Sequence, residues 1–167
     1  SWGARGGGHV VAVGKGMSAS RIGQRVAYFS DGSYAEYTAV PSHRAAIVPP
    51  DVQLQEAVGL FVQGLTAHYL ARTVYPVKSG TTCLIHAGAG GTGGLLIQLA
   101  KQLGATVIAT ASTIKKAEMA REHGADHALV YREPAEGGAL RLVPWLTDEV
   151  RRLTPGGGGG KSALTPS

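Results

Sequence analysis

The sequence predicts an α/β protein in which a small β domain precedes the first half of a doubly wound parallel sheet. Short β-like runs separated by turns fill the chain up to residue 50, whereas helices alternate with apolar strands beyond it. A glycine-rich loop joins the first of these strands to its helix, as in sheets that bind nucleotides. We therefore predict a β domain over 1–50, an α/β domain over 51–155 and a flexible tail over 156–167.

Four runs before residue 50 predict strands of a small sheet or partial barrel. Turn residues separate these runs, which are "HVVAVGKG", "QRVAYF", "SYAEYTAV" and "AAIVPP". The segment Tyr34–Val40 is rich in residues that favour strands and lies between Gly32 and Pro41, so we expect a strand there.

Beyond residue 50 the periodicity predicts a regular alternation of helices and strands. Leu96, Leu99 and Leu103 fall on one face of a predicted helix, and Gly104 stands where that helix stops. The elements expected in chain order are a helix over 51–75, a strand over 81–87, a helix over 92–104, a strand over 106–111, a helix over 113–124, a strand over 126–131 and a weaker helix over 146–154 capped by Thr147. We expect no further strand.

Composition and charge restrict the class of protein. The chain of 167 residues is 44% hydrophobic and 16% charged, which is typical of a globular protein. Its net charge of +5 comes from scattered residues without interleaved aromatics, so we expect an anionic small ligand and no nucleic acid. The longest apolar stretch, Ala57–Val74, is interrupted by Gln63, His68 and Arg72, and it predicts a buried helix rather than a membrane span.

Cysteine and histidine positions indicate neither a disulfide framework nor a metal site. Cys83 is the single cysteine and lies in an apolar run, so we expect a core residue in a reducing compartment, the cytoplasm. Six histidines are scattered without the spacing of zinc ligands, and no serine stands in a G-x-S-x-G motif. We therefore name no catalytic side chain.

The segment "HAGAGGTGG" (86–94) fits the phosphate-binding pattern G-x-G-x-x-G from Gly88 to Gly93. We expect Gly88 to make a tight turn, Gly90 to let the backbone approach a pyrophosphate, and Gly93 to let the helix pack close to the strand. The free N–H groups at the start of that helix favour an anion. The alternative is a glycine-rich turn without a ligand. His86 either borders the ligand or packs at the strand end.

The residues after the second predicted strand of the α/β domain indicate which dinucleotide binds. A site for NAD usually has Asp or Glu there, about 20 residues beyond the loop, to bind the ribose 2′-hydroxyl. This chain has Ser112 and Thr113 instead, followed by Lys115 and Lys116. Hydroxyl donors and positive charge suit a 2′-phosphate, so the sequence favours NADP(H) over NAD(H). The alternative for the two lysines is an ordinary solvated helix start.

The stretch from "QGLTAHYLARTVYPVKSGTTCLIHAGAGGTGG" to "REHGADHALVYR" resembles the NADPH:quinone reductase branch of the medium-chain dehydrogenase/reductase superfamily, the zeta-crystallin-like proteins. The stretch upstream, from Gly6, resembles the second part of that family's GroES-like catalytic domain, and the match extends to about Arg132. The resemblance implies a partial GroES-like domain over 1–50 and a partial Rossmann NADP-binding domain over 51–155.

The resemblance assigns site residues position by position. The family's A-x-x-G-x-x-G phosphate loop falls on Ala87, Gly90 and Gly93, and Gly91 and Thr92 lie between the last two. These matches place the phosphate loop where the glycine pattern also predicts it.

Three further residues match family positions that contact other parts of the cofactor. Thr66 in "QGLT" matches a threonine at the nicotinamide end, Lys116 matches a lysine that binds the 2′-phosphate, and Tyr131 matches a tyrosine beside that lysine. The predicted cofactor-binding residues are therefore Thr66, Ala87, Gly88, Gly90, Gly91, Thr92, Gly93, Ser112, Lys116 and Tyr131.

The chain departs from the family near its ends. Zinc-dependent relatives carry Gly-His-Glu where this chain has Gly3, Ala4 and Arg5, so the resemblance implies the zinc-free branch, although that branch commonly keeps an acid at the position of Arg5. The family has further strands before the first residue and after about residue 132. We therefore interpret the chain as a fragment.

The resemblance implies an NADPH-dependent quinone reductase that passes a hydride or single electrons to a quinone and whose full-length form is a homodimer. An NADPH-dependent enone or alkenal double-bond reductase of the same fold is the first alternative. The others are a non-catalytic NADPH-binding protein, of the lens structural type, and an inert fragment. Orientation and exclusion of water matter more than an acid or base in such a site, because the cofactor carries the chemistry.

Overall fold

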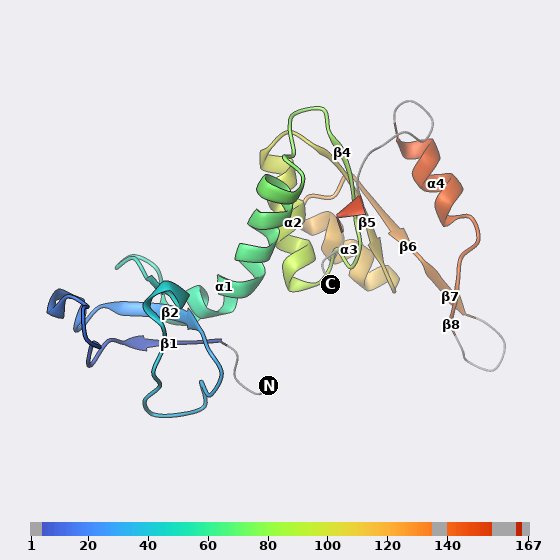
Figure 1. Cartoon of the computed structure of the whole chain (residues 1–167). Helices are drawn as coiled ribbons and strands as arrows, with labels where there is room; N and C mark the ends of the chain where they lie inside the picture. Colours follow the sequence, from blue (N-terminus) through green and yellow to red (C-terminus); the bar gives the residue numbers. More distant parts are fainter. Residues whose placement is uncertain (1–4, 135–139, 155–162, 165–167) are drawn as a thin grey trace. The chain divides into compact units, whose positions relative to one another are not determined.

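A computed structural model describes residues 5–134, 140–154 and 163–164 of the chain (Figure 1). Contacts between residues divide the chain into two compact units, Ser1–Leu65 and Thr66–Ser167. We call them the N-terminal and the C-terminal unit and describe each by itself. The division falls inside a helix, later than the predicted boundary at residue 50, and the three predicted domains stay a prediction.

The N-terminal unit contains a three-stranded antiparallel sheet in the order β1-β2-β3. Its elements are β1 (Arg5–His9), the 3₁₀ helix η1 (Ala19–Arg21), β2 (Arg25–Phe29), the 3₁₀ helix η2 (Ser42–Arg44) and β3 (Ala45–Ile47). The predicted strands "QRVAYF" and "AAIVPP" correspond to β2 and β3.

Two strand predictions in this unit are wrong. Instead of "HVVAVGKG", the strand β1 covers mainly the preceding glycines, where the chain pairs with β2. Glycine suits this strand because a Cβ at Gly6 would collide with Tyr28 and one at Gly7 with Val58. Residues 34–37 form bends, residues 38–40 have no regular secondary structure, and among the described residues no strand pairs with this segment. Its composition favours a strand, but a strand also needs a hydrogen-bonded neighbour.

The C-terminal unit contains a parallel sheet in the order β6-β5-β4-β9. Its elements along the chain are β4 (Thr82–Ile85), α2 (Gly91–Gln102), β5 (Thr106–Ala111), α3 (Ile114–Glu122), β6 (His127–Val130), β7 (Arg132–Pro134), β8 (Leu140–Leu142), α4 (Leu146–Leu153) and β9 (Ala163–Leu164). The predicted alternation of strand and helix through β6 is therefore confirmed. The expectation that no strand follows is wrong, because β9 pairs with Leu84 and Ile85 of β4.

The helices begin and end where local backbone chemistry dictates. The predicted first helix is α1 (Leu54–Tyr69), which continues as one π-helical turn, η3 (Leu70–Val74). Gly104 and Gly124 follow α2 and α3 with φ of +80° and +107°, so they end these helices as expected. Thr147 does not cap α4, since that helix begins at Leu146 and its N-cap residue is Trp145.

The core of the C-terminal unit lies between the sheet and the pair α2 and α3 (Figure 1). Val107, Ala109 and Ala111 of the central strand β5 all belong to it because alternate residues of a strand share one face. The full cluster is Ala67, Ala71, Val77, Cys83, Ile85, Leu96, Ile97, Ala100, Ala105, Val107, Ala109, Ala111, Ala117, Ala120, Ala125 and Ala128. Most of these residues are alanines, so α3 can approach the strands closely.

The tail predicted over 156–167 is described only at Ala163 and Leu164, which form β9. Its other residues lie outside the described part of the chain. Within the described residues, no helix is both long and apolar enough to cross a membrane.

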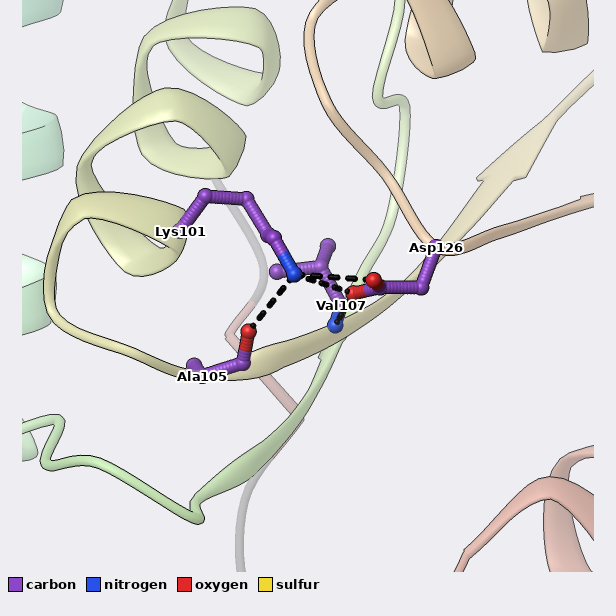
Figure 2. Close-up of polar contacts among 4 residues, drawn as sticks. All are labelled: Lys101, Ala105, Val107 and Asp126. Carbon is purple, nitrogen blue, oxygen red and sulfur yellow. Dashed lines mark hydrogen bonds and ion pairs between the residues drawn. The ribbon is translucent and has the colours of Figure 1, made fainter.

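Lys101 and Asp126 tie three elements together where β5 and β6 begin (Figure 2). The Lys101 Nζ donates to both carboxylate oxygens of Asp126 at 2.8 Å and to the Ala105 carbonyl at 3.1 Å. The Val107 N–H donates to Asp126 Oδ2 at 2.7 Å. Burial raises the pKa of the Asp126 carboxyl, but the hydrogen bonds from Lys101 and Val107 and the charge of Lys101 together bring that pKa below its ordinary value.

We predict that Asp126→Asn lowers the free energy of unfolding by about 1 kcal/mol at neutral pH, a modest value because both partners are about one-third exposed. The folded-state pKa is depressed, so the ion pair stabilises the chain fully above the unfolded-state pKa, about 4. That stabilisation is lost as pH falls through the folded-state pKa. Urea midpoints of the parent and the variant therefore converge in acid.

Glu122→Gln, which removes an exposed carboxylate from α3, is the matched control. It leaves the free energy of unfolding at neutral pH within about 0.5 kcal/mol of the parent value. If the difference in stability between the parent and Asp126→Asn stays constant from neutral pH into acid, the stabilisation does not come from the ionised Asp126 carboxylate.

Candidate functional site

The predicted site residues gather where the parallel strands end. Ile85 of β4 lies opposite Ala109 of β5, and Ala111 of β5 lies opposite Val130 of β6, so the three strands end at one edge of the sheet. The glycine loop, Ser112 and Tyr131 follow these three strands in turn. Ligands of open α/β sheets bind outside this carboxyl edge.

The glycine loop turns at Ala87, one residue before the predicted position. Ala87 has φ +54°, a left-handed conformation that costs a non-glycine residue about 1 kcal/mol. The Gly90 N–H closes the turn by donating to the Ala87 carbonyl at 2.8 Å. Gly88 has a different role, because a Cβ there would lie 2.9 Å from the Ala109 Cβ and 3.1 Å from the Ala120 Cβ. Gly88 is therefore required by close packing and not by the turn itself.

Both peptide groups of Gly88 are held by neighbouring elements. The Gly88 N–H donates to the Thr110 carbonyl of β5 at 3.1 Å, and His123 Nδ1 lies 3.3 Å from the Gly88 carbonyl. Thr110 is fully buried, and its hydroxyl pairs with His86 Nδ1 at 2.8 Å. The hydrogen bond to Thr110 therefore holds the His86 side chain at the end of β4, where the loop begins.

The helix α2 begins directly against this loop. Gly90 is its N-cap residue, and the Gly94 N–H donates to the Gly90 carbonyl at 2.7 Å. A Cβ at Gly93 would approach the Ala87 carbonyl oxygen to well under 3.0 Å. Gly93 therefore lets the helix pack closely against the loop, and not against the strand as predicted. The N–H groups of Gly91, Thr92 and Gly93 open the helix and have no acceptor four residues back within it. Together with the helix dipole they can hold an anion.

Residues with hydroxyl and basic side chains follow the ends of β5 and β6. The Tyr131 N–H donates at 3.0 Å to the carbonyl of Ala111, the residue before Ser112. Thr113 caps α3 by accepting from the Lys116 N–H at 3.3 Å, which sets Lys116 in the first turn of that helix. The Arg132 guanidinium lies 5.5 Å from the centre of the Tyr131 ring, so a second cation stands at this edge.

Thr66 is the one predicted residue that comes from a different part of the fold. It lies on α1, where its side chain is half-buried, and its assignment to the nicotinamide end rests on the resemblance.

Sequence reasoning missed His123 and Thr110, which contact the loop. Gly94 is the sequence feature that could have indicated a close neighbour such as His123. The phosphate pattern needs no glycine there, and a Cβ at Gly94 would lie 2.6 Å from the His123 ring. Thr110 carried no signal, because threonine is common in strands. The residues with resolved placement contain no group of three His, Cys, Asp or Glu side chains suited to a metal ion.

We predict that Gly93→Ala lowers the free energy of unfolding by about 2 kcal/mol, because the added methyl group must displace backbone. Gly59→Ala is the matched control, since Gly59 lies on α1 with nothing within 4 Å of its Cβ position. Alanine there is expected to stabilise the helix by up to about 1 kcal/mol. Urea unfolding of both variants measures the difference, and equal stabilities contradict the close contact at Gly93.

Comparisons with known proteins point to one family. A sequence model described as "Zinc-binding dehydrogenase" matches residues 91–160. The chain is 37% identical to the quinone oxidoreductase of Pseudomonas aeruginosa over 148 residues, which are 87% of this chain and 45% of that protein. It is 40% identical to a 2-haloacrylate reductase of a Burkholderia species over 126 residues, which are 73% of this chain and 38% of that protein.

A solved structure of the Escherichia coli quinone oxidoreductase, in complex with NADPH, superposes with a TM-score of 0.79 at 33% sequence identity. The superposition covers 96% of this chain and 46% of that one. The chain thus spans less than half the length of these relatives. The sequence similarity and the shared arrangement of strands and helices lead to the same assignment. The chain belongs to the quinone oxidoreductase family of the medium-chain dehydrogenase/reductase superfamily.

Proposed function

We propose that the chain binds NADP(H) and takes part in the reduction of a quinone. The observation that carries the proposal is the loop at the carboxyl edge, where the first N–H groups of α2 open beside Ala87. A relative that shares this fold is an NADPH-complexed quinone oxidoreductase. When bound, NADPH supplies the hydride or the electrons, so the chain's own residues have to bind and orient it.

Each part of the cofactor has a matching group in the proposed complex. The N–H groups of Gly91, Thr92 and Gly93 receive the pyrophosphate, and the other glycines of the loop let it come close. Ser112, Lys116 and Tyr131 surround the 2′-phosphate. Lys116 matters most there, because its charge attracts a phosphate that NADH does not have. Thr66 contacts the nicotinamide end.

Reduction of an activated double bond is the second candidate, and the Burkholderia relative favours it. That protein is a 2-haloacrylate reductase and is as similar in sequence as the quinone oxidoreductases are. Both reactions move a hydride or electrons from the same cofactor, so the loop does not distinguish them. The residues that surround the substrate accepting the hydride or electrons determine whether a quinone or an activated double bond is reduced.

We also propose that the protein acts in the cytoplasm and that its full-length form is a homodimer. The cysteine content supports the first statement, because a single cysteine, Cys83, can form no disulfide within the chain, which is usual in a reducing compartment. The second rests on the resemblance to the family.

We predict that NADPH binds more tightly than NADH and that Lys116→Gln removes this preference. Loss of one charged contact is expected to weaken NADPH roughly tenfold and to leave NADH unchanged. Lys115→Gln is the matched control, since Lys115 is also exposed in the first turn of α3 but matches no family position. Titration of cofactor fluorescence measures both affinities. Equal weakening by the two substitutions contradicts the role of Lys116.

We predict that the chain, supplied with NADPH, oxidises it faster with a quinone such as 1,4-benzoquinone than with an enone such as but-3-en-2-one. Absorbance of the nicotinamide follows both reactions. A faster enone reaction favours the second candidate, and NADPH binding without turnover on either acceptor favours a non-catalytic binding protein.

A further inference from the structure

We propose that His123 is a positioning residue for the phosphate loop. Its Nδ1–H group donates to the Gly88 carbonyl, and its ring covers Gly94 in the first turn of α2. His123 thereby fixes the loop conformation that receives the cofactor pyrophosphate. The ligand in this inference rests on the proposed function, whereas the effect of His123 on the loop does not.

The position of His123 is set by the end of α3. It is the C-cap residue of that helix, and its N–H donates to the Met119 carbonyl at 3.0 Å. Ala120 lies one turn earlier, against the Gly88 position, so the last turn of α3 meets the loop at two points. The His123 ring is half-buried between this turn and α2.

The contact requires a hydrogen on one particular ring nitrogen. A carbonyl oxygen only accepts, so His123 Nδ1 carries the hydrogen in the bond to Gly88. A side chain of similar size without a donor can fill the space above Gly94, but it cannot hold the Gly88 carbonyl. The donor is therefore the property that separates a positioning role from packing.

The loop needs this support because Ala87 is held in the left-handed region. Such a conformation persists only where the surrounding structure determines it. The Gly88 N–H is bound by Thr110 on one side, and His123 binds the Gly88 carbonyl on the other. Without the His123 donor, the peptide after Gly88 is free to rotate, and the turn that aligns the start of α2 loosens.

Amide hydrogen exchange of the chain without any cofactor tests this directly. In His123→Leu, the amides of Gly88 and Gly90 are expected to exchange about fivefold faster, which corresponds to one lost hydrogen bond. The amide of Ile108, at the centre of β5, reports global opening and is the internal reference. Unchanged exchange at Gly88 and Gly90, or a change equal to that at Ile108, overturns the inference.

Two more substitutions separate donation from shape. His123→Asn keeps a donor on the same Cβ–Cγ–N skeleton and is expected to restore slow exchange at Gly88. His123→Phe keeps a ring without a donor and is expected to behave as His123→Leu does. If the Leu variant does not fold, the Phe variant is used in its place. His43→Leu, at an exposed site in η2, is the matched control and leaves the exchange of the loop unchanged. Loss of protection in the Asn variant equal to that in the Leu variant overturns the inference.

Cofactor binding gives the second readout. NADPH affinity is expected to fall about fivefold in His123→Leu and to return in His123→Asn. A parent chain that does not bind NADPH refutes the proposed function but leaves the exchange result as the test of His123. A parent that binds, together with a Leu variant that binds equally well, overturns the role of His123 in receiving the pyrophosphate.

Discussion

No side chain fits between the loop that follows β4 and the first turn of α2, and the site depends on this close contact. Gly93 brings the helix backbone against the Ala87 carbonyl, and Gly88 brings the loop against Ala109 and Ala120. The helix can therefore begin at the carboxyl edge of the sheet with its first N–H groups beside the turn. A methyl group at Gly88 or Gly93 would push apart the elements that form the proposed anion site.

Three hydrogen bonds, two from elements outside the loop and one within it, offset the strain of its turn. The strand β5 supplies the Thr110 carbonyl, α3 supplies His123, and the Gly90 N–H of α2's cap closes the turn on Ala87. Hydrogen bonds worth about 1 kcal/mol each can outweigh a left-handed alanine of about the same cost. The loop is thus ordered before any ligand arrives, and a ligand does not have to provide that ordering energy.

Much of the C-terminal unit could be predicted because its pattern is local. The strand β5 was expected over 106–111 and has those bounds, because the run is too short for a helix and rich in β-branched residues. Contacts between distant segments decided the rest. Pairing with β2 makes a strand of the glycines at β1, whereas Tyr34–Val40 lacks a strand partner among the described residues. The contact of His123 with Gly88 joins residues 35 positions apart, beyond the reach of any local pattern.

The Lys101–Asp126 pair and the loop occupy opposite ends of the same strands. The pair fixes where β5 and β6 begin, and the site uses the residues at which these strands finish. The hydrogen bonds described for the pair share no residue with those described for the loop, so we expect the effects of changes at the two ends to be roughly additive. Substitutions in the proposed cofactor site at the strand ends can therefore be combined with substitutions that strengthen the Lys101–Asp126 pair and offset a loss of stability.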